Sequence, residues 1–468
     1  MSIYIYFICF HEKIHREVIM TNEINAIILA AGKGTRMKSH LPKVLHEIFN
    51  KPLLGWVIES IESLNHKTNC YCVLGHGIDK IEDYLKKNYP NAKTVVQKEQ
   101  LGTGHAVTCA IPYMENFKGT VLITCGDTPL IKSETLEKFI NYHTENNCDL
   151  TVMSAVYDNP FGYGRIVRNE KGNVARIVEQ KDADINEKSI NEVNAGVYCL
   201  NWEKIKPIFK KLNNNNSQGE YYLTDIVKIA NEDNLKVLSY KIEDNSEIFG
   251  INSRKNLAEA FDMMNKRHLE KLMENGVTIV DTNSTFISPE TTIENDTIVY
   301  PNTYIEGKNE IASFCKIGPM ARLRGNCTVG ENVKIGNFVE LKNARIAKNS
   351  HVCHLTYMGD AIVGEDVNIG AGTIFANYNS ITKEKKVSTL EDGVSIGSNS
   401  VLVAPVHLGK NAFTAALSCI TKDVEENSLA MTRTPQKEYK NWVINKEKEN
   451  EFKKYEKILP THDIKLFS

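Results

Sequence analysis

A six-residue period of branched aliphatic side chains runs through the second half of the 468-residue chain. The first members of this series are Ile287, Ile293, Val299, Ile305, Ile311, Ile317, Leu323, Val329, Ile335 and Leu341. The frame slips by one residue to Ile346, Val352 and Met358, slips again to Val363, Ile369 and Phe375, and resumes at Leu390, Ile396, Leu402, Leu408, Thr414 and Ile420. This period is typical of a parallel β-helix, in which each hexapeptide supplies one short strand and one corner. The sequence therefore predicts a solenoid, with the Asn377–Val387 insertion as a loop that projects from it.

The first half of the chain alternates short apolar runs with amphipathic stretches. The apolar runs are Ala26–Ala30, Cys70–Leu74, Val121–Thr124, Leu150–Val156 and Val193–Cys199, and helical spacing appears in Leu53–Leu64 and Ser133–Tyr142. This alternation predicts an α/β domain with a mostly parallel sheet, whose ligands bind beyond the carboxyl ends of the strands.

A helix with apolar residues at Leu257, Phe261, Met264 and Leu272 is expected between the two halves. We therefore expect three parts. An α/β domain covers residues 1–254, of which 1–21 form an N-terminal extension. A linker helix follows over 255–275, and the β-helix with a C-terminal tail covers 276–468.

Composition excludes several classes of protein. Lys and Arg number 56 and Asp and Glu 58, so no global positive field exists to hold nucleic acid or an anionic membrane. No apolar run approaches the roughly 18–20 residues that span a bilayer, and the short apolar segment Ile3–Phe10 lacks the flanks of a secretory signal. The 11 cysteines form no C-x-x-C pair, which favours the reduced thiols of a cytoplasmic protein.

Glycine-rich turns follow two of the predicted strands. Leu29–Met37 reads LAAGKGTRM, which does not fit a Walker A loop but lets backbone N–H groups approach a phosphate that Lys33 or Arg36 could neutralise. A basic surface turn is an equal alternative for this segment taken alone. Cys125-Gly126-Asp127 follows another strand, and a carboxylate there is a natural Mg²⁺ ligand. Gln97 and the turn Leu101–His105 offer amide and hydroxyl groups to the edge of a base.

The solenoid half contains the segment HVCHLTY, in which a lone histidine is most often structural. His351 with His354 could suggest a metal site, and Cys353 could suggest a thiol nucleophile. Both alternatives stay open, although each lacks further ligands or partners in the sequence.

The ordered segments LAAGKGTRM, LPKVLH, LGTGHA, CGD, GYGR, VEQKDA, NAG, EYYLTD and GINSR resemble the sugar-nucleotide pyrophosphorylases. Together with the hexapeptide half, residues 22–440 are similar to the bacterial family of bifunctional N-acetylglucosamine-1-phosphate uridylyltransferase / glucosamine-1-phosphate N-acetyltransferases. The resemblance implies a Rossmann-like nucleotidyltransferase domain followed by a left-handed β-helix. It implies acetyl transfer from acetyl-CoA to glucosamine 1-phosphate, then uridylyl transfer from UTP, which makes the amino-sugar donor for bacterial wall polymers.

The resemblance also implies a set of uridylyl-site residues at matching positions. They are Leu29, Ala30, Ala31, Gly32, Lys43, Gln97, Gly102, Thr103, Cys125, Gly126, Asp127, Gly164, Glu179, Asn194 and Asn252. Among them Asp127 and Asn252 are the implied Mg²⁺ ligands, and Lys43 with Arg36 would act on the reacting phosphates. Cys125 departs from the family, which often has Tyr there, so a ring contact at this position is in doubt.

For acetyl transfer, the resemblance implies that His354 is the base that strips the substrate ammonium before attack, with Glu340 as its orienting partner. The implied glucosamine-1-phosphate residues are Arg324, Lys342, Tyr357, Asn368, Asn377 and Tyr378, and the implied acetyl-CoA residues are Ala371, Ser398, Ala416 and Arg433. Ala376 and Asn379 replace the Cys and Asp of the family's C-N-Y-D segment, so the contribution of those two side chains is lost.

The acetyl-site candidates lie several coils apart, so one small substrate is not expected to reach all of them on a single chain. The resemblance implies a homotrimer that shares this site between chains. Two other functions stay open: a nucleotidyltransferase for another sugar with a regulatory solenoid, and a non-enzymatic assembly subunit. The latter would be expected to lose Lys43, Asp127, Asn252 and His354, which are all present.

Overall fold

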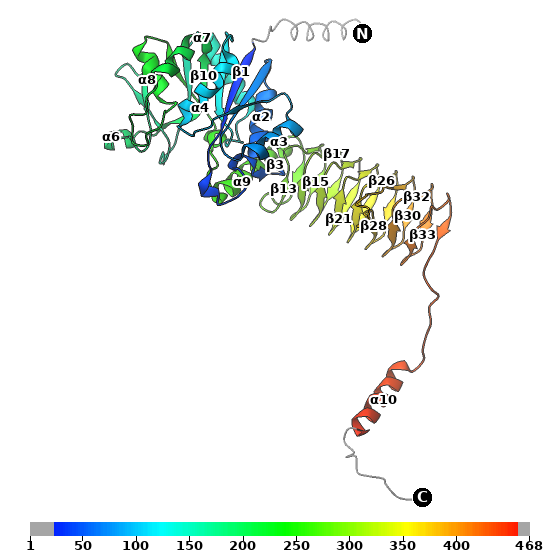
Figure 1. Cartoon of the computed structure of the whole chain (residues 1–468). Helices are drawn as coiled ribbons and strands as arrows, with labels where there is room; N and C mark the ends of the chain where they lie inside the picture. Colours follow the sequence, from blue (N-terminus) through cyan, green and yellow to red (C-terminus); the bar gives the residue numbers. More distant parts are fainter. Residues whose placement is uncertain (1–22, 457–468) are drawn as a thin grey trace, which may run out of the picture. The chain divides into compact units, whose positions relative to one another are not determined.

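The computed structural model describes residues 23–456 and divides into two compact units. The first unit runs to Ile293 and includes Tyr304–Asn309, and the second comprises Glu294–Thr303 and the chain from Glu310 onward (Figure 1). Helix α9 (Arg254–Glu274) occupies the place of the expected linker helix and belongs to the first unit. The expected N-terminal extension, residues 1–21, lies outside the described residues, and the domain boundaries near 254 and 276 stay predictions.

A nine-stranded sheet forms the centre of the first unit. Its order is β11 (Val237–Lys241), β7 (Leu150–Val156), β10 (Glu192–Asn201), β6 (Thr120–Cys125), β1 (Ile24–Ala30), β4 (Thr68–Leu74) and β5 (Lys93–Val96), with β8 (Arg165–Arg168) and β9 (Val174–Val178) as a hairpin beside β10. Strand β1 is parallel to β4 and β6, β4 to β5, and β7 to β11, whereas β10 is antiparallel to its neighbours. The prediction of a mostly parallel sheet is confirmed.

Helices cover both faces of this sheet. Residues of α2 (Leu53–Glu62), α3 (Ile78–Asn88) and α5 (Ser133–Glu145) join one core, and residues of α4 (Thr103–Ala110), α7 (Trp202–Ile205) and α8 (Asp225–Glu232) join the other. Because side chains alternate along a strand, Ile28 of β1 lies in the first core and Ile27 in the second. Burial on both faces explains why these strands read as continuous apolar runs.

Short elements complete the first unit. They are η1 (Thr35–Met37), η2 (Lys43–Leu45), β2 (Glu47–Ile48), β3 (Lys51–Pro52), η3 (Ile111–Met114), α6 (Ile185–Lys188), η4 (Lys206–Lys211), η5 (Asn245–Ile248), β12 (Thr278–Ile279), β13 (Phe286–Ile287), β14 (Thr292–Ile293) and β16 (Tyr304–Glu306). No helix among residues 23–456 combines the length and the apolar character that crossing a membrane requires.

The second unit is a left-handed parallel β-helix built from three parallel sheets (Figure 1). One sheet contains β15 (Ile298–Val299), β18 (Lys316–Ile317), β21 (Lys334–Asn337), β24 (His351–His354), β27 (Asn368–Ile369), β30 (Ser395–Ile396), β33 (Phe413–Thr414) and β35 (Leu429–Ala430). The next contains β19 (Arg322–Arg324), β22 (Glu340–Lys342), β25 (Tyr357–Gly359), β28 (Ile374–Ala376), β31 (Val401–Val403) and β34 (Cys419–Ile420). The last contains β17 (Glu310–Ile311), β20 (Thr328–Val329), β23 (Arg345–Ile346), β26 (Ala361–Val363), β29 (Ser388–Leu390) and β32 (Val406–Leu408), and helix α10 (Trp442–Glu456) follows.

The aliphatic series forms the buried interior of this solenoid. Ile317 pairs in register with Ile335, Ile335 with Val352, and Val352 with Ile369. All the residues of the predicted series are buried. The slips in the frame are therefore coils one residue shorter, which keep the aliphatic side chains stacked. The loop 377–387 lies between the consecutive strands β28 and β29, which belong to different sheets, as the break in the period predicts.

Two candidate active sites

Three segments of the first unit meet beyond the carboxyl ends of β1 and β6. The Gly126 N–H donates to the Leu29 carbonyl at 2.9 Å, which joins the turn after β6 to the end of β1. The Ile251 N–H donates to the Asp127 carbonyl at 3.0 Å, so Asn252 comes to lie beside Asp127. Backbone hydrogen bonds thus assemble residues that are far apart in the sequence.

Lys43 lies between the two expected metal ligands, Asp127 and Asn252. Its ammonium forms an ion pair with the Asp127 carboxylate and donates to Asn252 Oδ1 at 3.2 Å. The two oxygens therefore face one positive centre, and carboxylate and amide oxygens are the donor atoms that Mg²⁺ prefers. This donor set fits Mg²⁺, which takes few protein ligands and completes its shell with water and substrate phosphates.

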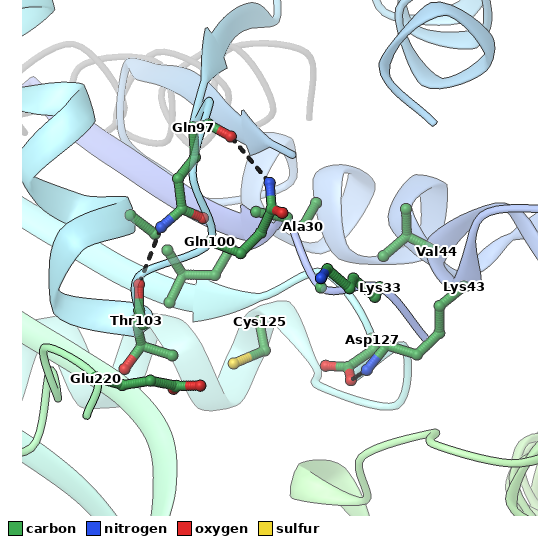
Figure 2. Close-up of a pocket in the computed structure, with 15 residues that line it drawn as sticks. Ala30, Lys33, Lys43, Val44, Gln97, Gln100, Thr103, Cys125, Asp127 and Glu220 are labelled. Carbon is green, nitrogen blue, oxygen red and sulfur yellow. Dashed lines mark hydrogen bonds and ion pairs between the residues drawn. The ribbon is translucent and has the colours of Figure 1, made fainter. Parts of the chain in front are cut away.

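A cavity of about 450 Å³ opens at this end of the sheet. Figure 2 shows amide and hydroxyl groups of Gln97, Gln100 and Thr103 at one end and Lys43 with Asp127 at the other. The expected residues that line it are Leu29, Ala30, Ala31, Gly32, Lys43, Gln97, Gly102, Thr103, Cys125 and Asp127. An elongated ligand with a polar ring and phosphates matches this separation of groups.

Lys33, one of the two cations that the glycine-rich turn offered for a phosphate, also lines the cavity, together with residues that were not among the expected ones: Val44, Gln100, Ala106 and Glu220. Glu220 enters because the next residue, Tyr221, exchanges hydrogen bonds with Leu101 and Gly104 at 2.8 Å each. Gly102 permits this close approach, since its φ is +111° and a Cβ there would lie 2.6 Å from the Tyr221 carbonyl oxygen. The EYYLTD segment was the available signal for Glu220.

Gly164, Glu179 and Asn194 form a separate cluster that does not line the cavity. The Asn194 N–H donates to the Gly164 carbonyl at 2.9 Å, and the Thr224 hydroxyl donates to Glu179 Oε1 at 3.0 Å. Burial raises the pKa of the Glu179 carboxyl. Cys125 has a thiol instead of a ring at the cavity wall, where burial raises its pKa to about 12.

Arg36 is exposed on η1, and it is not one of the described residues that line the cavity. Its expected action on the leaving pyrophosphate stays a prediction.

In the solenoid, the coil length brings two cations into register and the projecting loop adds a third. Arg324 on β19 pairs in register with Lys342 on β22, so their side chains are neighbours on adjacent coils. The next register partner, Gly359 on β25, has no side chain. Contact with the Lys385 side chain of the projecting loop, together with partial burial and the Arg324 guanidinium, lowers the pKa of Lys342. Lys385 was not among the expected residues, because its contact depends on the conformation of the loop.

The expected pairing of His354 with Glu340 is wrong in this structure. The Glu340 carboxylate accepts a hydrogen bond from Arg324 Nε at 2.6 Å, whereas His354 Nδ1 lies 2.9 Å from Asn337 Oδ1. Asn337 and His354 are register partners on β21 and β24. Sequence reasoning missed Asn337, although the one-residue slip in the aliphatic frame, which shortens this coil to 17 residues, was an available signal for it.

The other expected acetyl-site residues follow one side of the solenoid. Asn377 donates to Asp360 Oδ2 at 2.6 Å and accepts a long bond of 3.5 Å from the Tyr357 hydroxyl. Asn368 and Tyr378 are exposed. The residues that follow Ala371, Ser398 and Ala416 are corner residues with positive φ: Gly372, Asn399 and Leu417. Arg433 is exposed after β35.

The alternatives for the HVCHLTY segment gain no support. Among residues 23–456, no three His, Cys, Asp or Glu side chains gather in a way that could hold a metal ion. Burial raises the pKa of the Cys353 thiol, which disfavours the thiolate that a nucleophile requires.

Comparison with known proteins assigns the chain to a family. The nucleotidyl transferase family matches residues 25–248, and the family described as the GMPPB C-terminal domain matches residues 305–430. The bifunctional protein GlmU of Clostridioides difficile (strain 630) is 43% identical over 91% of this chain and 98% of its own length. The GlmU of Carboxydothermus hydrogenoformans is 42% identical over 90% of this chain and 100% of its own, and that of Alkaliphilus metalliredigens 41% over 91% and 99%. This chain therefore belongs to the family of bifunctional GlmU proteins, enzymes that combine uridylyl transfer with glucosamine-1-phosphate acetyl transfer.

Proposed function

We propose that uridylyl transfer from UTP to N-acetylglucosamine 1-phosphate takes place in the cavity of the first unit. The observation that carries this proposal is the position of the Lys43 ammonium between Asp127 and Asn252 at the charged end of the cavity. A phosphate oxygen of the sugar phosphate attacks the α-phosphorus of UTP, and the bond from that phosphorus to the bridging oxygen of pyrophosphate breaks. Lys43 neutralises charge on the phosphates, and the amide end of the cavity holds the uracil ring.

Mg²⁺ is proposed to bind Asp127 and Asn252. When bound, it would draw charge from the phosphate oxygens as a Lewis acid. The Lys43 ammonium, which otherwise pairs with Asp127, would then be available for the phosphates of the substrate.

Acetyl transfer is proposed to take place at His354. Because Asn337 Oδ1 faces His354 Nδ1, that nitrogen carries the proton and Nε2 keeps its lone pair. Nε2 takes a proton from the ammonium of glucosamine 1-phosphate, and the amine attacks the thioester carbonyl of acetyl-CoA. The carbon–sulfur bond breaks, the new amide nitrogen loses its remaining extra proton, and CoA leaves as the thiol. The cations of Arg324, Lys342 and Lys385 would hold the phosphate, whose charge relieves their mutual repulsion.

A row of exposed apolar residues along one edge of the solenoid supports the proposal of a homotrimer. Met320, Phe338, Leu355 and Leu417 are exposed by 46% to 64% and have positive φ values of 51° to 60°. A left-handed backbone is uncommon for such residues, and an exposed apolar row marks an interaction surface. At another edge of the solenoid, the corner residues with positive φ are mostly Asn or Asp: Asn332, Asn349, Asp366, Asn411 and Asn427. We assign the apolar edge to contact between chains. We also assign the assembled enzyme to the cytoplasm.

The test is product analysis with acetyl-CoA, glucosamine 1-phosphate, UTP and Mg²⁺ supplied together. The expected products are free CoA, pyrophosphate and UDP-N-acetylglucosamine, with N-acetylglucosamine 1-phosphate alone when UTP is omitted. Parallel reactions with thymidine triphosphate and with glucose 1-phosphate test for another sugar nucleotidyltransferase. Release of pyrophosphate only with glucose 1-phosphate, or no turnover at all, would contradict the proposal.

A further inference from the structure

Arg165 is a buried cation without a carboxylate partner among the described residues. Its side chain is 2% exposed, and it is among the largest fully buried side chains of the structure. A guanidinium buried to this extent is usually paired with an acid, because an isolated charge is costly to remove from water. A buried, unpaired guanidinium at position 165 therefore requires a reason other than the stability of the core.

The hydrogen bonds of Arg165 end on two short segments. One terminal nitrogen donates to the Tyr163 carbonyl, and the other donates to Gln180 Oε1 at 2.8 Å. The Gln180 oxygen also accepts from the Gly162 N–H at 3.1 Å. The Nε atom is buried and has no partner. The guanidinium therefore ties the loop before β8 to the residue that follows Glu179.

These two segments carry the sugar-site candidates. Arg165 pairs in register with Val178 across the β8–β9 hairpin, so Gly164 and Glu179 are the next residues outward on the two strands. A Cβ at Gly164 would lie 3.6 Å from both carboxylate oxygens of Glu179. Each hydrogen bond of Arg165 thus ends on a residue adjacent to Gly164 or Glu179.

We propose that Arg165 is a positioning residue for the sugar phosphate, because it fixes the spacing between the Gly164 backbone and the Glu179 carboxylate. This inference rests on the proposed function, in which Gly164, Glu179 and Asn194 contact the sugar. The planar guanidinium spans two acceptors at once, which a single lysine ammonium cannot do with the same geometry. Arg165 itself touches no substrate in this assignment.

The loop that Arg165 holds has a second anchor. The Tyr163 ring stacks on Tyr157 with centroids 5.2 Å apart and an interplanar angle of 19°. The aromatic pair joins the start of the loop, Tyr157, to Tyr163, and Arg165 bonds to the carbonyl of the same Tyr163. Loss of Arg165 leaves the ring stack in place and removes only the bonds to the Tyr163 carbonyl and Gln180, which makes a local effect on the sugar subsite the expected result.

The experiment compares Arg165→Lys and Arg165→Met with a matched control, Arg168→Met, in the full chain. Arg168 lies on the same strand, but it is exposed and pairs with Glu192 at 2.6 Å. For both Arg165 variants we expect KM for N-acetylglucosamine 1-phosphate to rise about tenfold or more, the equivalent of one charge-assisted hydrogen bond. KM for UTP should stay within about twofold of the wild-type value for all three variants. Acetyl transfer measures the amount of enzyme in the same sample, and thermal unfolding shows whether the first unit, which contains Arg165, is folded.

Two results would overturn the inference: an equal rise in both KM values, or no rise in the sugar-phosphate KM. Should Arg165→Met fail to fold, Gln180→Met removes one acceptor of the guanidinium and keeps the arginine, and it should raise only the sugar-phosphate KM. An inactive wild-type enzyme would instead contradict the proposed function, so the two failures are distinguishable.

Discussion

At the scale of residues, the charged end of the nucleotide cavity depends on a three-way contact. Lys43, Asp127 and Asn252 lie on three separate segments. The bond from the Ile251 N–H to the Asp127 carbonyl joins two of these segments, and the Lys43 ammonium joins the third. The ion pair is largely shielded, with side-chain exposures of 15% and 16%, so each group depends on the others for compensation. A change in one of them affects how the remaining charges are placed.

Asp127→Ala should abolish uridylyl transfer, because it removes the carboxylate proposed to bind Mg²⁺ and frees Lys43 from its ion pair. Acetyl transfer should stay within about twofold of the wild-type rate, since the solenoid has its own core and residues. Both activities are measured on one preparation. If both fall together in a folded variant, the assignment of separate sites is wrong.

His354→Ala should lower acetyl transfer by about 10²- to 10⁴-fold, the usual contribution of a positioned base. Asn337→Leu should cause a smaller loss, because the imidazole is retained without the acceptor that fixes its tautomer. For both variants uridylyl transfer is the internal control. The loss caused by His354→Ala should shrink at high pH, where the substrate amine is already deprotonated. A loss that is constant across pH would contradict the role as a base.

At the scale of elements, helix α9 completes the core of the first unit. Ala260 and Met264 of α9 join a buried cluster with Ile48, Phe49 and Leu53. Its N-terminus is capped by the Ser253 hydroxyl, which accepts from the Asn256 N–H. The helix therefore stabilises the segment that carries Lys43, although it contributes no residue to the cavity.

A fragment of residues 23–276 should fold and transfer uridylyl groups, whereas 23–253 should be less stable by about 3–5 kcal/mol, the usual cost of losing large apolar contacts. Neither fragment should transfer acetyl groups. Thermal unfolding with and without UTP and Mg²⁺ compares the two. Equal stability of the fragments would mean that α9 is only a connector, and acetylation by either would contradict the assignment of His354.

The predictable part of the molecule is the part that local patterns determine. Ile317 and Ile335 are predicted to stack because the six-residue period repeats, and the CGD turn is predicted to reach the site because parallel strands end at one edge. The contact of Asn337 depends on a one-residue slip in the frame, which the sequence shows but which the regular period alone does not translate into a side-chain partner, and the contact of Lys385 depends on a loop conformation that no periodic pattern encodes. The burial of Arg165 depends on tertiary packing around a single hairpin.

At the scale of the whole molecule, the acetyl-site candidates lie along the edge that also exposes apolar side chains. His354 directly precedes Leu355, and Ala416 precedes Leu417, both exposed and both with positive φ. The proposed base, His354, and the proposed acetyl-CoA residues thus follow a surface that water contacts in the single chain. Covering that edge with a second chain would bury the apolar residues and exclude water from the thioester.

The last prediction concerns a site shared between chains. His354→Ala and Arg433→Ala should each abolish or strongly reduce acetyl transfer when assayed alone. If the two residues of one site come from different chains, trimers that contain both variants must include some sites with an intact His354 and an intact Arg433. Co-expression, or mixing after reversible dissociation, should therefore restore part of the acetyl transfer, with uridylyl transfer as the measure of total enzyme. Subunit exchange is verified by affinity tags that differ between the variants. No recovery despite exchange would contradict the shared site, and full acetyl transfer by a species with the mass of a monomer would contradict the trimer.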